Sequence, residues 1–273
     1  MYFEVAEFHE RLKKTKESML RHKIEVLVVS DPANMNYLTG YDGWSFYVHQ
    51  GLVVALDRDE PLWWGRGMDG NGAKLTTWLR HDSIRPYEDD YVQNVFKHPM
   101  SFVADLIREH GWERKTLGVE MDNYWFTGKC LETLAEELPA MEIADATSLV
   151  NWVRVIKSPA EIAYMKQASK VCEHVMRTAV DSIKVGAPES SAAANVYHAC
   201  ITGTPEFTGD HPAIFPIMPS NERTSCAHLG WDPERAYAPG DLILLELCGV
   251  RFRYHCPLSR TVYIGTPHEK LRK

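Results

Sequence analysis

Residues 242–263 of this chain read LILLELCGVRFRYHCPLSRTVY, and this stretch decides the fold of the second half. Its first part is an apolar run that carries a single carboxylate, Glu246. A second run, with the β-branched and aromatic residues that strands favour, begins at Ser259. Short apolar runs bounded by turn residues are typical of strands. The stretch therefore predicts a two-stranded hairpin with Glu246 on its first strand.

The composition is that of an ordinary globular protein. The chain has 273 residues, of which 45% are hydrophobic and 25% charged, and this length predicts one large domain or two modest ones. The formal net charge is -7, with Lys and Arg interleaved among Asp and Glu, which argues against a nucleic-acid partner. The sequence has no apolar run of membrane-spanning length, and Met1 to Val5 lack the pattern of a signal peptide. We therefore expect a cytoplasmic protein with no membrane partner.

The cysteines indicate reduced thiols. Six are present without a C-x-x-C pair, which in a chain of this length favours free thiols over a disulfide framework. Cys248 and Cys256 could face each other across the hairpin, but buried free thiols are the favoured interpretation.

The first ~145 residues alternate between helical and strand patterns. Apolar residues recur at helical spacing in 8–20, and compact apolar runs predict strands at 24–29 and 51–56. The patterns that follow predict a helix at 102–110, a strand at 116–120 and a helix at 131–138. This alternation predicts an α/β domain with a mixed or parallel sheet.

The pattern changes near residue 150, where we place a domain boundary, giving domains 1–150 and 151–273. Residues 151–157 are expected to be extended and to lead into a helix. Ser158 is the expected N-cap of that helix, with Pro159 at its first position and Glu161 closing a capping box. A second helix is expected from 189, followed by strands at 213–218, 242–248 and 260–264.

Three motifs carry a resemblance to a known family. They are SDPANMNYLTGY (30–41), RVIKSPAEI (154–162), and TSCAH (224–228) followed by GDLILLE (240–246) and SRT (259–261). In this order and spacing they resemble the creatinase/prolidase family of pita-bread hydrolases across essentially the whole chain. The resemblance implies a creatinase-type α/β N-terminal domain and an α+β pita-bread catalytic domain. It also implies a turn and a strand at the first motif.

The resemblance also bears on metal binding. In metal-dependent members, an Asp on the first hairpin strand is followed, eleven positions later, by a second Asp. The corresponding positions here hold Glu246 and Pro257, and proline cannot bind a metal. We therefore expect no metal and no other cofactor. His211, His255 and His268 lack a metal-binding spacing, and solvent exposure is the favoured interpretation for them.

Two residues are the expected catalytic groups. The resemblance places His228 where the family has its proton-handling histidine, and imidazole suits that role because it titrates near neutrality. Glu246 follows four apolar residues, so we expect it to be largely buried and therefore paired. Its partner would be a cationic substrate, which it either anchors or attacks as a nucleophile. The alternative is a structural ion pair with one of three arginines, Arg251, Arg253 or Arg260.

Substrate contacts are expected from Trp44, Phe46 and Tyr47, together with Arg260. In creatinase-like homodimers the N-terminal domain of one subunit contributes to the pocket of the other, and an indole can pack on a cationic ring. The alternative is that these aromatic side chains belong to an ordinary core.

The resemblance implies a hydrolase that cleaves a C–N bond. The residues GWSFY (43–47) and ELCG (246–249) are most similar to the family members that hydrolyse ectoine, a cyclic amidine. We therefore expect a small cyclic amidine as substrate, a metal-free reaction and a homodimer. The alternatives are a metal-dependent X-Pro peptidase and an inactive remnant or binding protein. The inactive remnant is an alternative because the family's catalytic domain continues into a segment with another His and two Glu ligands, which we expect to be absent here.

Overall fold

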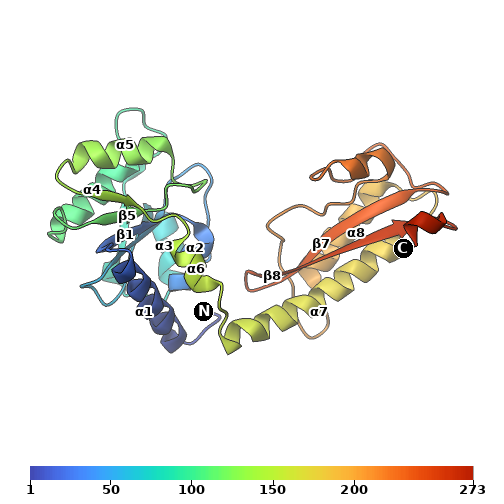
Figure 1. The fold of residues 1–273 in the computed structure, drawn as a ribbon, viewed down its shortest axis with the longest axis horizontal. Coiled ribbons are helices and arrows are strands. Elements are labelled where there is room, and N and C mark those ends of the chain that lie inside the picture. Colours follow the sequence, from blue (N-terminus) through green and yellow to red (C-terminus); the bar gives the residue numbers. More distant parts are fainter. Residues whose placement is uncertain (273) are drawn as a thin grey trace. The chain divides into compact units, whose positions relative to one another are not determined.

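The chain divides between Ile156 and Lys157 into two units, here called the N-terminal and the C-terminal unit (Figure 1). Both are described from a computed structural model that covers residues 1–272.

A mixed six-stranded sheet runs through the N-terminal unit in the order β4-β3-β2-β1-β5-β6. Strand β1 pairs antiparallel with β2 and parallel with β5, which confirms the predicted α/β domain with a mixed sheet. The strands are β1 (Val26–Val29), β2 (Gly51–Ala55), β3 (Leu62–Arg66), β4 (Ile84–Tyr87), β5 (Leu117–Val119) and β6 (Ile143–Asp145).

Helices cover both faces of this sheet (Figure 1). Val26 and Val28 pack in one core with α4 and α5, whereas Leu27 and Val29 pack in a second core with α1, α2 and α6. Because both faces are buried, β1 is a continuous apolar run rather than an alternating one. The helices are α1 (Val5–Arg21), α2 (Pro32–Thr39), α3 (Asp69–Thr76), α4 (Pro99–Glu109), α5 (Gly128–Glu137) and α6 (Leu149–Arg154), with short 3-10 turns at His81–Ser83 and Asp89–Tyr91.

The first motif forms a helix, so the expected turn and strand were wrong. Asp31 is the N-cap of α2 and its carboxylate accepts hydrogen bonds from the backbone N–H groups of Ala33 and Asn34, at 2.7 and 3.1 Å. Pro32 occupies the first helical turn, where its missing N–H costs nothing. Asp-Pro was therefore a helix start rather than a turn.

The segment before the unit boundary is also helical rather than extended. Leu149 and Val150 are buried in the second core of the N-terminal unit, and the amide of Asn34 donates a hydrogen bond to Asn151. Arg154 donates to the side-chain oxygen of Asn34 at 2.7 Å. These contacts hold α6 in the N-terminal unit, so the division of the chain falls after Ile156.

The C-terminal unit packs two helices against a hairpin. Ser158 caps α7 and forms the predicted capping box with Glu161, with Pro159 in the first turn. Buried side chains of both helices share one core with Ile243, Leu245 and Leu247 of the hairpin. The elements are α7 (Pro159–Ser182), α8 (Glu189–Thr202), β7 (Leu242–Arg251) and β8 (Tyr254–Tyr263), with 3-10 turns η3 (Asn221–Ser225) and Glu269–Leu271.

Strand β7 is paired along both edges. It pairs antiparallel with β8 over its whole length, which confirms the predicted hairpin. On its other edge, Ile217 and Ser220 form isolated bridges with Glu246 and Ile243. The strand expected at 213–218 is thus reduced to single bridging residues.

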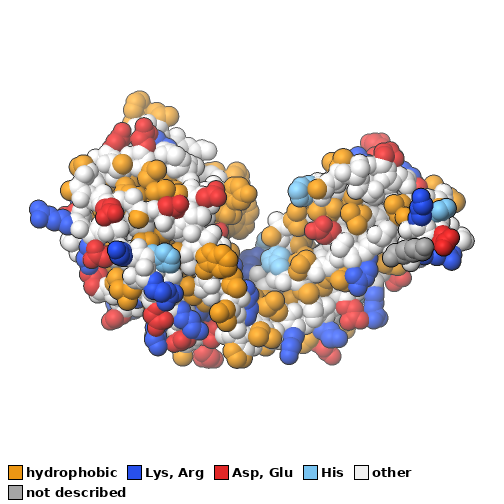
Figure 2. Space-filling model, viewed as in Figure 1, with side chains coloured by type: hydrophobic (Ala, Val, Ile, Leu, Met, Phe, Trp, Pro, Cys, Tyr) orange, Lys and Arg blue, Asp and Glu red, His pale blue; other side chains and the backbone are white. Residues whose placement is uncertain are grey.

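The surface of each unit carries scattered hydrophobic patches, and those on one face are visible in Figure 2. Within residues 1–272, no helix is long and apolar enough to cross a membrane. All six cysteines have free thiols.

Candidate functional site

A small pocket lies on one face of the hairpin, in the C-terminal unit. Its volume is about 170 Å³, and most of its wall is apolar. Strand β7 contributes Glu246, Leu247 and Cys248, and β8 contributes His255 and Pro257. The remaining wall consists of Val196 and Cys200 from α8, with Pro212, Ile214, Phe215 and Pro216 from the following loop.

The register of the hairpin explains which side chains share this pocket. Cys248 pairs with Pro257, and Glu246 pairs with Ser259. Directly paired residues lie on the same face, and alternate residues along a strand share it. Glu246 and Pro257 are therefore diagonal neighbours in one pocket. These are the two positions at which the family resemblance placed metal ligands.

Glu246 is exposed, so its expected burial was wrong. The apolar residues beside it belong to the opposite face of β7, where Leu245 and Leu247 are buried in the core. A run of apolar residues on a strand does not distinguish a face covered by helices from a face that opens onto a pocket.

The alternative of a structural ion pair for Glu246 is not borne out either. Among the residues that the structure describes, its carboxylate has no ion-pair or hydrogen-bond partner. Arg251 is hydrogen-bonded to Gln167 and Thr208, and Arg253 lies 3.4 Å from Asp210. The carboxylate is therefore available to a ligand at the rim of the pocket.

The other polar groups of the pocket are already engaged. The Nε2 atom of His255 accepts a hydrogen bond from the backbone of Ala213 at 3.0 Å, and its Nδ1 donates to the carbonyl of Arg253 at 2.9 Å. Burial raises the pKa of the Cys200 thiol to about 11 and that of Cys248 to about 12, so both remain protonated at neutral pH. Glu246 is thus the one charged group of the pocket wall in the described chain.

His255 was missed by the sequence reasoning, which favoured solvent exposure. It is half-buried and lines the pocket. A signal was present, because His255 lies two residues before Pro257 and strand residues two apart point to the same face.

Two of the expected site residues lie elsewhere in the C-terminal unit. His228 is exposed in the loop after η3 and is not among the described residues that line the pocket. Arg260 pairs with Leu245, which places it on the face opposite to Glu246, and it donates to the carbonyl of Ser259 at 2.7 Å. Arg260 therefore does not share a face with Glu246, since adjacent strand residues alternate between faces, and its substrate contact stays a prediction.

The three expected aromatic contacts lie in the N-terminal unit. Trp44, Phe46 and Tyr47 are 58%, 79% and 48% exposed, so they do not belong to a core. Their rings form a chain, with centroids 5.9 Å apart for Trp44 and Phe46 and 5.4 Å for Phe46 and Tyr47. Trp63 and Trp64, by contrast, are fully buried on β3.

A buried ion-pair network supports the outer edge of β7. Glu189 is fully buried and lies 2.8 Å from Arg235, which also contacts Asp241 at 2.7 Å. Asp241 accepts a hydrogen bond from Asn221, and Glu189 accepts one from Ser220. The network thereby ties α8 and η3 to the start of β7. Hydrogen bonding to Arg235 lowers the pKa of Asp241 to about 2.

The fold and the hairpin define a two-domain hydrolase scaffold of the pita-bread type. The family model for the creatinase/prolidase N-terminal domain matches residues 11–156, and that for metallopeptidase family M24 matches residues 163–273. The chain belongs to the creatinase/prolidase family, with a creatinase-type N-terminal domain followed by an M24 domain.

Two relatives with similar sequences are named as hydrolases. Over 267 residues the chain is 45% identical to the ectoine hydrolase of Halomonas elongata, covering 96% of this chain and 66% of that protein. It is 40% identical to the uncharacterized hydrolase/peptidase y4tM of Sinorhizobium fredii, covering 100% of this chain and 69% of the relative. The chain thus spans about two thirds of the length of these relatives.

Solved structures support the same fold. A dipeptidase PepE from Mycobacterium ulcerans aligns with a TM-score of 0.76 at 20% identity, over 98% of this chain and 68% of that one. The prolidase from Pyrococcus horikoshii aligns with a TM-score of 0.74 at 20% identity, over 96% and 67%.

The M24 family name implies a metal ion, and the pocket residues of the described chain do not fit a two-metal centre. Glu246 offers a carboxylate at one expected ligand position, but Pro257 has no donor atom at the other. Both nitrogens of His255 are hydrogen-bonded. Within residues 1–272, Glu246 belongs to no group of three His, Cys, Asp or Glu side chains close enough to hold an ion.

Proposed function

We propose that this protein hydrolyses a C–N bond in a small cyclic amidine such as ectoine, without a metal ion. The observation that carries this proposal is the carboxylate of Glu246, which has no cationic partner in the described chain and stands at the rim of a small apolar pocket. The ectoine hydrolase relative, at 45% identity, supports the substrate class.

The chemistry of an amidinium ring matches this pocket. An amidinium is a planar cation with N–H donors, and a carboxylate can accept from it in a charge-assisted hydrogen bond. The apolar wall would strengthen that attraction, because water is excluded from part of its surroundings. A volume of about 170 Å³ also suits a single small ring, since a cavity of ~150 Å³ holds one benzene molecule.

Two roles of Glu246 are compatible with its position. As an anchor, its carboxylate pairs with the amidinium and orients the ring for attack by water. As a nucleophile, one carboxylate oxygen attacks the central amidine carbon, one ring C–N bond breaks as its nitrogen takes up a proton, and water then hydrolyses the bond between the carboxylate and that carbon to release the product. Loss of an anchor raises KM, whereas loss of a nucleophile removes kcat, so steady-state kinetics of a Glu246 variant separate the two roles.

His228 is the proposed proton donor to the departing nitrogen. It is exposed on the loop after η3, so its imidazole is open to solvent, although it does not line the pocket itself. We also propose a homodimer in which Trp44, Phe46 and Tyr47 of one subunit cover the ring bound by the other. Their exposure in the N-terminal unit supports this role.

The test is hydrolysis of ectoine, creatine and an X-Pro dipeptide by the full chain, with and without a chelator. We expect ectoine to be opened at the same rate in both conditions. The Glu246→Gln variant should lose at least about 100-fold in kcat/KM, because the loss of a nucleophile or of a charged group that pairs with the reacting centre has effects of that size. The Glu206→Gln variant, at an exposed position that does not line the pocket, is the matched control and should retain full activity.

Two results would overturn the proposal. Near-normal activity of Glu246→Gln would remove the residue on which it depends. Cleavage of the X-Pro dipeptide that stops in chelator and returns with a divalent metal would identify a metal-dependent peptidase instead.

A further inference from the structure

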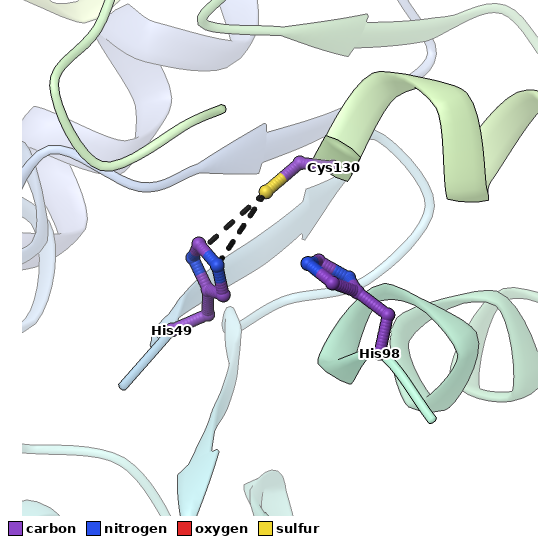
Figure 3. A group of neighbouring side chains, drawn as sticks. All are labelled: His49, His98 and Cys130. Carbon is purple, nitrogen blue, oxygen red and sulfur yellow. Dashed lines mark hydrogen bonds between the residues drawn. The ribbon is translucent and has the colours of Figure 1, made fainter. Parts of the chain in front are cut away.

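Three metal-ligating side chains meet in the N-terminal unit. They are His49, His98 and Cys130, and their ligand atoms all lie within 4.8 Å of one another. Figure 3 shows the two imidazole rings and the sulfur pointing toward a common space. The sulfur of Cys130 lies 3.8 Å from Nδ1 and 3.9 Å from Nε2 of His49, and the two ring centroids are 5.0 Å apart.

The three side chains come from separate elements, so tertiary folding alone brings them together. His49 lies two residues before β2, His98 is the N-cap of α4, and Cys130 stands in the first turn of α5. In sequence they are far apart and form no motif with metal-binding spacing. This explains why the sequence reasoning did not single them out.

We propose that His49, His98 and Cys130 bind a zinc ion. Two imidazoles and one thiolate are a donor set that suits zinc, whose sites combine His nitrogen and Cys sulfur in tetrahedral geometry. Tetrahedral bonds of about 2.3 Å to sulfur and 2.0–2.1 Å to nitrogen place those two atoms roughly 3.5 Å apart. The observed Cys130–His49 separation of 3.8 Å is close to that value.

The surroundings of His49 favour metal binding. Its ring is hydrogen-bonded to the backbone of Trp125, which leaves the second ring nitrogen for a ligand. A metal-binding histidine commonly donates its other N–H to a backbone carbonyl in this way, because that bond sets its tautomer and orientation.

His98 has a competing hydrogen bond. Its Nδ1 accepts from the backbone N–H of Met100 at 3.1 Å and so caps α4. A metal on Nε2 requires a proton on Nδ1, so binding breaks this cap. The thiol of Cys130 loses its proton to solvent as the metal–sulfur bond forms. The two histidines are only half-buried, which leaves room for a water molecule as the fourth ligand.

A bound ion would join the segment before β2 to the starts of α4 and α5. Because it would bind only the folded N-terminal unit, it should raise the melting temperature of the chain. This site is independent of the proposed hydrolysis, whose pocket lies in the C-terminal unit.

The test uses the full chain after chelator treatment, titrated with zinc and, separately, with cobalt(II). We expect one ion per chain at this site, a zinc-dependent rise in melting temperature, and a thiolate-to-cobalt charge-transfer band in the near ultraviolet. Cys130→Ser should abolish the band and weaken binding at this site at least about 100-fold. His98→Asn should also lose the ion, while Asn retains the cap of α4.

Cys226→Ser is the matched control, because Cys226 is an exposed thiol in the C-terminal unit, and it should leave the cobalt spectrum unchanged. The proposal is overturned if the wild-type chain shows no charge-transfer band, or if the band persists in Cys130→Ser. It is also overturned if zinc binding is the same in wild type and His98→Asn. The absence of the band from the wild-type chain overturns the proposal even if a variant does not fold.

Discussion

Replacing Gly249 with alanine should force α7 away from β7. A Cβ atom at this position would lie 2.2 Å from the backbone nitrogen of Cys172 and 2.3 Å from the carbonyl oxygen of Ala168. Non-bonded heavy atoms reach their optimal separation at about 3.5–4.0 Å, so the helix and the strand would have to separate by roughly 1 Å. Both neighbours are helix backbone and cannot move as a flexible side chain can.

Gly249→Ala should therefore lower the free energy of unfolding by about 3 kcal/mol, at the upper end of the range for overpacked cores. For a unit of this size that corresponds to a fall in melting temperature of about 10 °C or more. Circular dichroism during heating of the full chain measures the change. The matched control is Gly72→Ala in α3, where an added Cβ meets nothing within 4 Å. Alanine there should leave stability unchanged or raise it by up to about 1 kcal/mol.

A Gly249→Ala protein that melts within about 2 °C of wild type would refute this reasoning, because the close approach of α7 and β7 could then not be as the structure shows. A comparable fall in the melting temperature of Gly72→Ala would instead indicate that the chain tolerates alanine poorly at glycine positions in general.

Two further predictions concern the ion-pair network beside β7. Arg235→Met should lower the free energy of unfolding in urea by about 3 kcal/mol, because it leaves the buried Glu189 and Asp241 without their cation. The control Arg177→Met, at the exposed ion pair with Glu173, should change that free energy by less than about 1 kcal/mol. Equal losses in the two variants would contradict this prediction. The pKa of Asp241 is lowered from 3.8 to about 2, so its ionised form stabilises the fold above pH 4 by about 2 kcal/mol, and this contribution is lost as the pH falls from 4 toward 2. The stability difference between wild type and Asp241→Asn, measured by urea unfolding at several pH values, should therefore shrink over that range, and a constant difference would show that the carboxylate is not perturbed.

Local signals in the sequence were sufficient for several elements. The capping box at Ser158 and Glu161 was predictable because all its partners lie within four residues. The α/β alternation and the hairpin were predictable from apolar runs for the same reason. Asn151 was misread as extended because its helical turn depends on Asn34, more than a hundred residues away in the chain.

The candidate pocket required more than local signals. The sequence singled out Glu246 and Pro257 by their spacing on one hairpin, and the structure places both in one pocket. It did not reveal that Glu246 is exposed, because an apolar run does not say which face of a strand the helices cover. The face of β8 on which Arg260 lies likewise follows only from its pairing with Leu245.

The sequence by itself thus determined the family, the α/β alternation of the first unit, the capping box and the residue types at the two hairpin positions, because these depend on short-range patterns. Only the tertiary structure decided which side chains share a space. It placed His255 beside Pro257 in the pocket, left the Glu246 carboxylate without a partner in the described chain, and gathered His49, His98 and Cys130 from three separate elements. Such contacts depend on how helices pack on a sheet, and spacing along the chain does not encode them directly.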